Sequence, residues 1–204
     1  MMDERLRVIL IGGTSNIGKS TVAARLAEQL GWGVRSTDKL ARYPGRPWPT
    51  PTWEVPPHVA EHYRTLSDVD LVEGQLAHYQ NMWPLVDALV REHAGDPATE
   101  RLVLEGSGIW PDNVLALHLP SVAAVWLSGS PELIEARIFA ESGYANADAE
   151  RRLLIERFVV RSIGYDREMR AAVSRLGQRL IEVTSTTSVD QLAALCLERM
   201  RPLA

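Results

Sequence analysis

The sequence predicts an α/β protein built on a mainly parallel sheet, and three observations lead to this fold class. Short apolar segments that read as buried strands alternate with longer segments of helical periodicity. The first apolar segment runs into the glycine-rich sequence GGTSNIGKS, residues 12–20, and a helical pattern follows. The chain of 204 residues, 46% of them hydrophobic, can bury a core without disulfides, and we expect one domain over 1–204.

The elements are predicted from hydrophobic periodicity and from residues that begin or end helices. Buried strands are expected over 5–11, 33–36, 101–105, 122–127 and 179–183. Helices are expected over 19–30, 58–66, 67–94 and 149–176, with further helices starting at 130 and 188. Pro84 predicts a kink or break in the third helix. The Pro-rich segment 43–57 is expected to be an ordered loop, because its two tryptophans are too apolar for a free linker.

Composition and charge exclude several classes of protein. The net charge of −4 gives no broad basic surface for nucleic acid, and no apolar run approaches the ~20 residues of a membrane-spanning helix. A single cysteine, Cys196, rules out an internal disulfide and fits a reducing, cytoplasmic compartment. The first residues lead straight into a strand, so we expect no signal peptide. Of 22 basic side chains only Lys19 and Lys39 are lysines, which draws attention to both.

Residues 13–20 match the P-loop pattern G-x-x-x-x-G-K-[ST] between a strand and a helix. Glycines let the backbone wrap a phosphate, and amides of the loop and of the helix N-terminus face the anion. Lys19 is expected to reach the β- and γ-phosphates, and the Ser20 hydroxyl to take a Mg²⁺ position. ATP, or alternatively GTP, is therefore predicted to bind with Mg²⁺. The predicted contacts in the loop are Gly13, Thr14, Ser15, Asn16, Ile17, Gly18, Lys19, Ser20 and Thr21.

A P-loop occurs in GTPases, motors, transporters and kinases, so further features must separate these classes. The guanine-reading sequence N-K-x-D and the switch sequence D-x-x-G are both absent. The chain is also small for a motor or transporter domain. Kinases of small molecules and of nucleotides remain.

The sequence resembles one group of such kinases. IGGTSNIGKST at 11–21, followed by Ser36-Thr37-Asp38, is similar to 2-phosphoglycerate kinases and more broadly to the shikimate kinase, gluconate kinase and chloramphenicol phosphotransferase group. Leu104-Glu105-Gly106 and the arginines near 156–161 continue the likeness. The resemblance implies a three-layer P-loop fold like that of nucleotide kinases, with a five-stranded parallel sheet in the order 2-3-1-4-5. It also implies a helical acceptor-binding insert over 39–100 and a lid over about 137–161.

The sequence also departs from the group. Ala41 stands where the phosphoglycerate kinases tend to have an arginine, and Arg42 comes one residue later. Glu105-Gly106-Ser107-Gly108 replaces the glycine triplet of shikimate kinases, and the Pro-rich segment matches neither pattern. The resemblance therefore predicts the type of reaction without naming the acceptor.

Candidate roles follow from position at the carboxyl edge of the sheet, where α/β proteins bind ligands. In the similar phosphotransferases an Asp at this position faces the acceptor hydroxyl, so the resemblance implies that Asp38 orients this hydroxyl and takes its proton, with a helix cap as the alternative. Glu105 is predicted to hold Mg²⁺ and, with Ser107, to contact substrate, unless this segment is only a turn. Thr37 either completes the Mg²⁺ shell or ends a strand. Lys39 either contacts an acidic group or is solvated.

Arginines form the second group of candidates. By its position Arg137 resembles the arginine on the adenine side of similar kinases. Arg157 is predicted to be catalytic and Arg161, four residues on, to bind substrate; ion pairs with Glu150 and Glu156 are the alternative. Acceptor contacts are also predicted for Arg42 and Arg46 of the insert.

One further pattern is His58-Val-Ala-Glu61-His62, which fits the inverted zinc-protease sequence H-x-x-E-H. Zinc needs a third protein ligand that is not evident, so a pocket wall or a surface helix is favoured. The sequence as a whole predicts a kinase that phosphorylates a hydroxyl of a small metabolite or natural product, a sugar-acid-like or antibiotic acceptor. Alternatives are a nucleoside or nucleotide kinase and a nucleotide-binding regulatory ATPase. A homodimer is compatible with the sequence.

Overall fold

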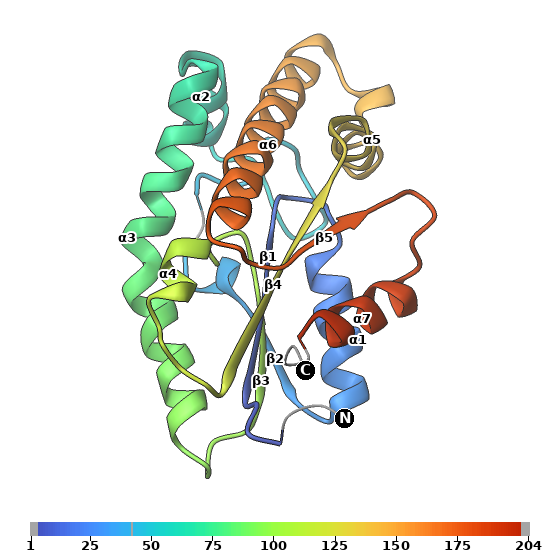
Figure 1. Ribbon diagram of the computed structural model, residues 1–204. Helices are drawn as coiled ribbons and strands as arrows, with labels where there is room; N and C mark the ends of the chain where they lie inside the picture. Colours follow the sequence, from blue (N-terminus) through green and yellow to red (C-terminus); the bar gives the residue numbers. More distant parts are fainter. Residues whose placement is uncertain (1–3, 42, 201–204) are drawn as a thin grey trace.

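The computed structural model describes residues 4–41 and 43–200. Five parallel strands form one sheet in the order β2-β3-β1-β4-β5, which confirms the order implied by the resemblance (Figure 1). The strands are β1 Val8–Gly13, β2 Gly33–Ser36, β3 Leu102–Glu105, β4 Val122–Gly129 and β5 Leu180–Val183.

Helices cover both faces of the sheet, in the three layers that were expected (Figure 1). The α-helices are α1 Lys19–Leu30, α2 Pro57–Thr65, α3 Asp68–Gly95, α4 Pro111–Leu115, α5 Pro131–Ser142, α6 Ala149–Arg175 and α7 Val189–Arg199. Two 3₁₀ turns, η1 Thr37–Lys39 and η2 Tyr144–Asn146, complete the described elements. In this part of the chain no helix is both long and apolar enough to cross a bilayer.

The alternation of side chains along β1 explains the two layers. Ile9 and Ile11 pack into the core that includes residues of α1 and α7, whereas Val8 and Leu10 pack into the core that includes residues of α3 and the later part of α6. All four side chains are fully buried, as expected for a strand covered on both faces. The sheet is therefore a rigid support for the loops at its carboxyl edge.

Three local expectations differ from the structure. β1 extends through Gly12 and Gly13, where a Cβ on Gly12 would lie 2.3 Å from the Trp126 ring; only glycine allows this pairing with β4. The break at Pro84 does not occur, because this residue is on the exposed side of α3, where water can satisfy the freed carbonyl. The short helix α4 was not predicted.

Candidate nucleotide and acceptor site

The P-loop forms a phosphate cradle between β1 and α1. Gly13 and Gly18 have φ of +139° and +102°, and a Cβ on Gly13 would lie 2.3 Å from the Leu127 carbonyl oxygen. Asn16 is also left-handed, with φ of +59°. No side chain caps the N-terminus of α1, so its first amides remain available to an anion. This backbone fits the phosphates of a nucleotide.

Two predicted loop contacts have structural roles as well. Thr14 is fully buried and its hydroxyl donates to the Ser162 carbonyl oxygen at 2.8 Å, which ties the P-loop to α6. Ile17 is also buried, while its carbonyl accepts a hydrogen bond from Arg137 at 2.8 Å. The side chains of both residues therefore hold the loop in shape, and any contact with phosphate falls to their backbone.

Lys19 is the buried lysine of the site. It is 8% exposed, and Nζ donates to the Thr14 carbonyl oxygen at 2.6 Å. Burial lowers the pKa of Lys19, while the carboxylates of Glu105 and Asp38 act in the opposite direction. An ammonium group between two carboxylates and an anion cradle is placed to neutralise phosphate. Lys39, by contrast, is exposed in η1 and does not line the cavities described below.

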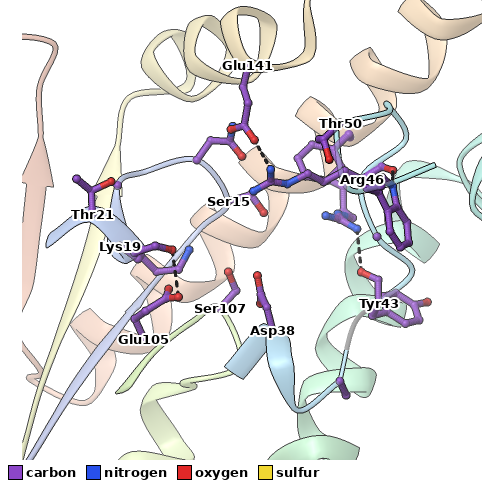
Figure 2. A pocket seen from close by; sticks show the side chains of 18 of the residues that line it. Ser15, Lys19, Thr21, Asp38, Tyr43, Arg46, Thr50, Glu105, Ser107 and Glu141 are labelled. Carbon is purple, nitrogen blue, oxygen red and sulfur yellow. Dashed lines mark hydrogen bonds and ion pairs between the residues drawn. The ribbon is translucent and has the colours of Figure 1, made fainter. Parts of the chain in front are cut away.

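Ser20 and Glu105 come together as a candidate magnesium site. Ser20 Oγ donates to Glu105 Oε1 at 3.0 Å, and Glu105 is buried at the carboxyl end of β3. Figure 2 shows the Glu105 side chain near Lys19. Hydroxyl and carboxylate oxygens are the donors that Mg²⁺ prefers, so these residues fit the ion.

Asp38 faces the same site from the end of β2. Ser36 Oγ accepts the hydrogen bond from Asp38 N at 3.3 Å, so Ser36 caps η1 and the alternative of Asp38 as a cap is wrong. Among the described residues none donates a hydrogen bond to the Asp38 carboxylate, which lines the cavity beside Lys19. Thr37 instead packs inward against Gly106, where a Cβ would lie 1.8 Å from Thr37 Oγ1.

A cavity of about 500 Å³, called the first cavity below, joins the P-loop to η1 and the Pro-rich segment. Aromatic rings and polar groups alternate on its wall, a mixture that suits a small hydroxylated compound. The P-loop and strand-end residues that line it are Ser15, Asn16, Gly18, Lys19, Ser20, Thr21, Asp38, Glu105 and Ser107. The opposite wall includes Tyr43, Arg46, Trp53, Tyr79, Glu141, Phe158 and Arg161.

Arg161 is the most deeply buried charge in the first cavity, at 3% exposure. Its guanidinium lies 4.4 Å from the centre of the Phe158 ring and 5.3 Å from that of Tyr63, and it donates to the Tyr63 hydroxyl and to the Tyr43 carbonyl oxygen. Its Nε has no hydrogen-bond partner, and no carboxylate among the described residues forms an ion pair with Arg161. A buried cation without a counter-charge is costly, so this group calls for an anion.

Arg157, in contrast, lines neither the first cavity nor the second cavity described below. Its guanidinium pairs with Asp68 and donates to the backbone carbonyls of Leu66 and Tyr63, which fastens α6 to the junction of α2 and α3. The structure therefore gives Arg157 a packing role in place of the predicted catalytic one, and its ion pair is with Asp68 instead of Glu150 or Glu156.

The other predicted substrate contacts are placed as follows. Arg46 lines the first cavity, pairs with Glu141 and lies over the Trp48 ring at 5.9 Å. Ser107 also lines this cavity, and its hydroxyl donates to the Gly13 carbonyl oxygen at 2.8 Å. Arg42 lies outside the described residues.

A second cavity, of about 550 Å³, adjoins the other side of the P-loop. Arg137 lines it and donates to the Ile17 carbonyl oxygen, and burial lowers the pKa of its guanidinium. Val183, Thr187 and Leu192 provide the facing wall. A flat ring placed between these groups would lie next to the phosphate cradle, as the predicted adenine-side role of Arg137 requires.

Two residues that line the first cavity, Tyr79 and Glu141, are not among the predicted site residues. Tyr79 is half-buried, and the buried Gln75 donates from Nε2 to its phenol oxygen at 2.9 Å. Burial raises the pKa of Tyr79, so the phenol stays protonated. The spacing of four residues on one helix face is the signal that pairs them. Glu141, the other of the two, lines both cavities.

The H-x-x-E-H segment does not form a metal site in the structure. His58 is exposed, whereas His62 packs edge-on against Tyr43 at 5.2 Å between ring centres. Burial lowers the pKa of His62. Within residues 4–41 and 43–200 no group of three or more metal-ligating side chains occurs.

The chain has the fold of known P-loop kinases. No family model matches it, and no curated protein sequence is significantly similar. Among solved structures it is similar to a gluconokinase from Sinorhizobium meliloti 1021, with 19% identity, TM-score 0.51 and coverage of 95% of this chain and 90% of the other. For a shikimate kinase from Aquifex aeolicus vf5 the identity is 16%, the TM-score 0.51 and the coverage 94% and 95%. A deoxyadenosine kinase from M. mycoides has 14% identity and a TM-score of 0.53, with coverage of 94% of this chain and 98% of the other. At these identities the likeness establishes the fold, and the chemistry rests on the residues of the site.

Proposed function

We propose that the protein is a kinase that transfers the γ-phosphoryl group of ATP to a hydroxyl of a small hydroxylated acid. The observation that carries the choice of acceptor is Arg161, a buried guanidinium without a counter-charge in the same cavity as Asp38 and Lys19. A carboxylate on the acceptor would compensate this charge. The names of two structural neighbours, a gluconokinase and a shikimate kinase, point to acceptors of this kind.

In the proposed reaction the chain's residues bind, orient and move a proton. Asp38 accepts a hydrogen bond from the acceptor hydroxyl and takes its proton as the oxygen bonds to phosphorus. Lys19 neutralises the charge on the transferring group, and Arg161 fixes the acceptor at its acidic end. Mg²⁺, held through Ser20 and Glu105, supplies further charge neutralisation when bound. ADP leaves from the P-loop.

The predicted insert and lid keep their roles in this proposal. Segment 39–100 contributes Tyr43, Arg46 and Tyr79 to the first cavity, which supports its role in acceptor binding. A lid over the nucleotide must reach both cavities. Segment 137–161 contributes Arg137 to the second cavity and Arg161 to the first, which supports its role as the lid.

The test uses pairs of acceptors that differ only in charge. Wild-type protein is incubated with Mg²⁺ and either ATP or GTP. Each reaction contains one acceptor, which is gluconate, glucitol, glycerate, glycerol or deoxyadenosine. Mass spectrometry then detects the gain of a phosphoryl group. We expect transfer to acids and little to their neutral partners. Transfer to deoxyadenosine alone would favour a nucleoside kinase, the function in the name of the third neighbour, and would overturn the proposal.

A further inference from the structure

Glu141, near the C-terminus of α5, is placed between the two halves of the site. One carboxylate oxygen accepts a hydrogen bond from Asn16 of the P-loop. The other pairs with Arg46 of the Pro-rich segment (Figure 2). Among the residues that the structure describes, Glu141 is the one acidic side chain that lines both cavities. A single carboxylate therefore connects the phosphate cradle, the lid region and the acceptor segment.

This carboxylate stands where its charge opposes a phosphate. Asn16, the residue that it contacts, lies within the cradle, so the phosphates of a bound nucleotide come close to Glu141. Like charges close to each other repel, and water at this partly exposed carboxylate weakens the repulsion without removing it. Arg46 is attracted both by the Glu141 carboxylate and by the nucleotide phosphates, but its guanidinium can form a close ion pair with only one of these anions.

The backbone near Arg46 is held firmly, so a change of partner falls to its side chain. Tyr63 donates its hydroxyl proton to the Gly45 carbonyl oxygen at 3.0 Å, and Trp53 Nε1 donates to the Arg46 carbonyl oxygen at 3.0 Å. The Arg46 and Glu141 side chains are 46% and 39% exposed. Ion pairs this exposed are weak, and a long arginine side chain can exchange them readily.

We propose that Glu141 is a positioning residue that couples the two cavities by competing with the nucleotide phosphates for Arg46. Bound phosphates release Arg46 from Glu141, and the guanidinium then lies at the border of the two sites, next to the transferring group. Nucleotide binding thereby prepares the acceptor cavity. The inference rests on the proposed nucleotide site and does not depend on which acceptor is used.

The experiment measures the affinity for Mg²⁺–AMP-PNP and Mg²⁺–ADP by calorimetry, on the full chain. The variants are Glu141→Gln, Arg46→Gln and the double variant; Glu135→Gln, an exposed glutamate on the same helix, is the control. We expect Glu141→Gln to bind AMP-PNP about three- to tenfold more tightly, with a smaller gain for ADP. The gain must shrink in the Arg46→Gln background, and Glu135→Gln must bind like wild type.

Two results would overturn the coupling. One is equal or weaker binding by Glu141→Gln, which would make Glu141 only a support for the left-handed Asn16. The other is an equal gain in nucleotide affinity from Glu141→Gln in the wild-type and Arg46→Gln backgrounds, which would leave repulsion between Glu141 and the phosphates as the cause. If wild type binds no nucleotide, the proposed function itself fails, so the two failures are distinguishable.

Discussion

Replacement of Arg161 by methionine separates a binding arginine from a structural one. The change removes two cation–π contacts, each worth about 1 kcal/mol, and two hydrogen bonds worth about 1–2 kcal/mol each. It also removes a buried charge without a counter-ion, whose desolvation costs several kcal/mol. Because these contributions oppose each other, we expect the free energy of unfolding to change by about 1 kcal/mol or less.

The affinity for the acceptor should respond quite differently. A charge-assisted contact between Arg161 and an acidic acceptor is worth about 2–3 kcal/mol, so KM for the acceptor should rise about 100-fold in Arg161→Met. Nucleotide affinity should not change. Urea unfolding and initial-rate kinetics on the same preparation measure both quantities.

Arg157→Met provides the matched control, because Arg157 is on the same helix but contacts Asp68 and the α2–α3 junction. We expect it to lose about 1–3 kcal/mol of stability with an unchanged KM. Arg161 would instead be a structural residue if Arg161→Met destabilised the fold by more than about 3 kcal/mol while KM stayed at the wild-type value.

Three further changes test other parts of the site and fold. Lys19→Ala should abolish tight binding of Mg²⁺–ATP in calorimetry, and unchanged affinity would exclude the P-loop assignment. Tyr79→Phe should raise KM for the acceptor about tenfold while nucleotide affinity stays constant. In the Tyr79→Phe background, removal of the Gln75 side-chain amide should not raise this KM further. Burial raises the pKa of Asp166 to about 6 from 3.8, so stability should fall as pH rises through this window. Asp166→Asn should remove that fall and should be the more stable protein at pH 7 in urea unfolding; the same dependence of stability on pH in both proteins would contradict this.

Local patterns were sufficient for the parts of the site that sit on strand ends. The P-loop follows a buried strand, and Asp38 and Glu105 follow two others, so parallel strands bring all three to one edge. The strand order itself came from the resemblance, since no local signal in the chain states which strands are neighbours.

Patterns on helices were less informative, because helical periodicity does not indicate which neighbouring element a helix face contacts. Arg157 and Arg161 share a stripe of α6, yet one meets the α2–α3 junction and the other the first cavity. Glu141 and Arg46 are 95 positions apart, and nothing local links them. The predicted break at Pro84 is wrong for the same reason: the exposure of Pro84, which makes it tolerable within α3, depends on tertiary packing.

In the proposed function, this site couples nucleotide turnover to phosphorylation of an acidic acceptor. The most direct test measures ADP and phosphorylated acceptor together, with wild type and Asp38→Asn, in the presence and absence of the acid found in the screen. We predict equal amounts of both products from wild type, little ADP without acceptor, and neither product from Asp38→Asn, which should still bind nucleotide. Release of ADP and free phosphate at one rate, with or without acceptor and in both proteins, would contradict the account.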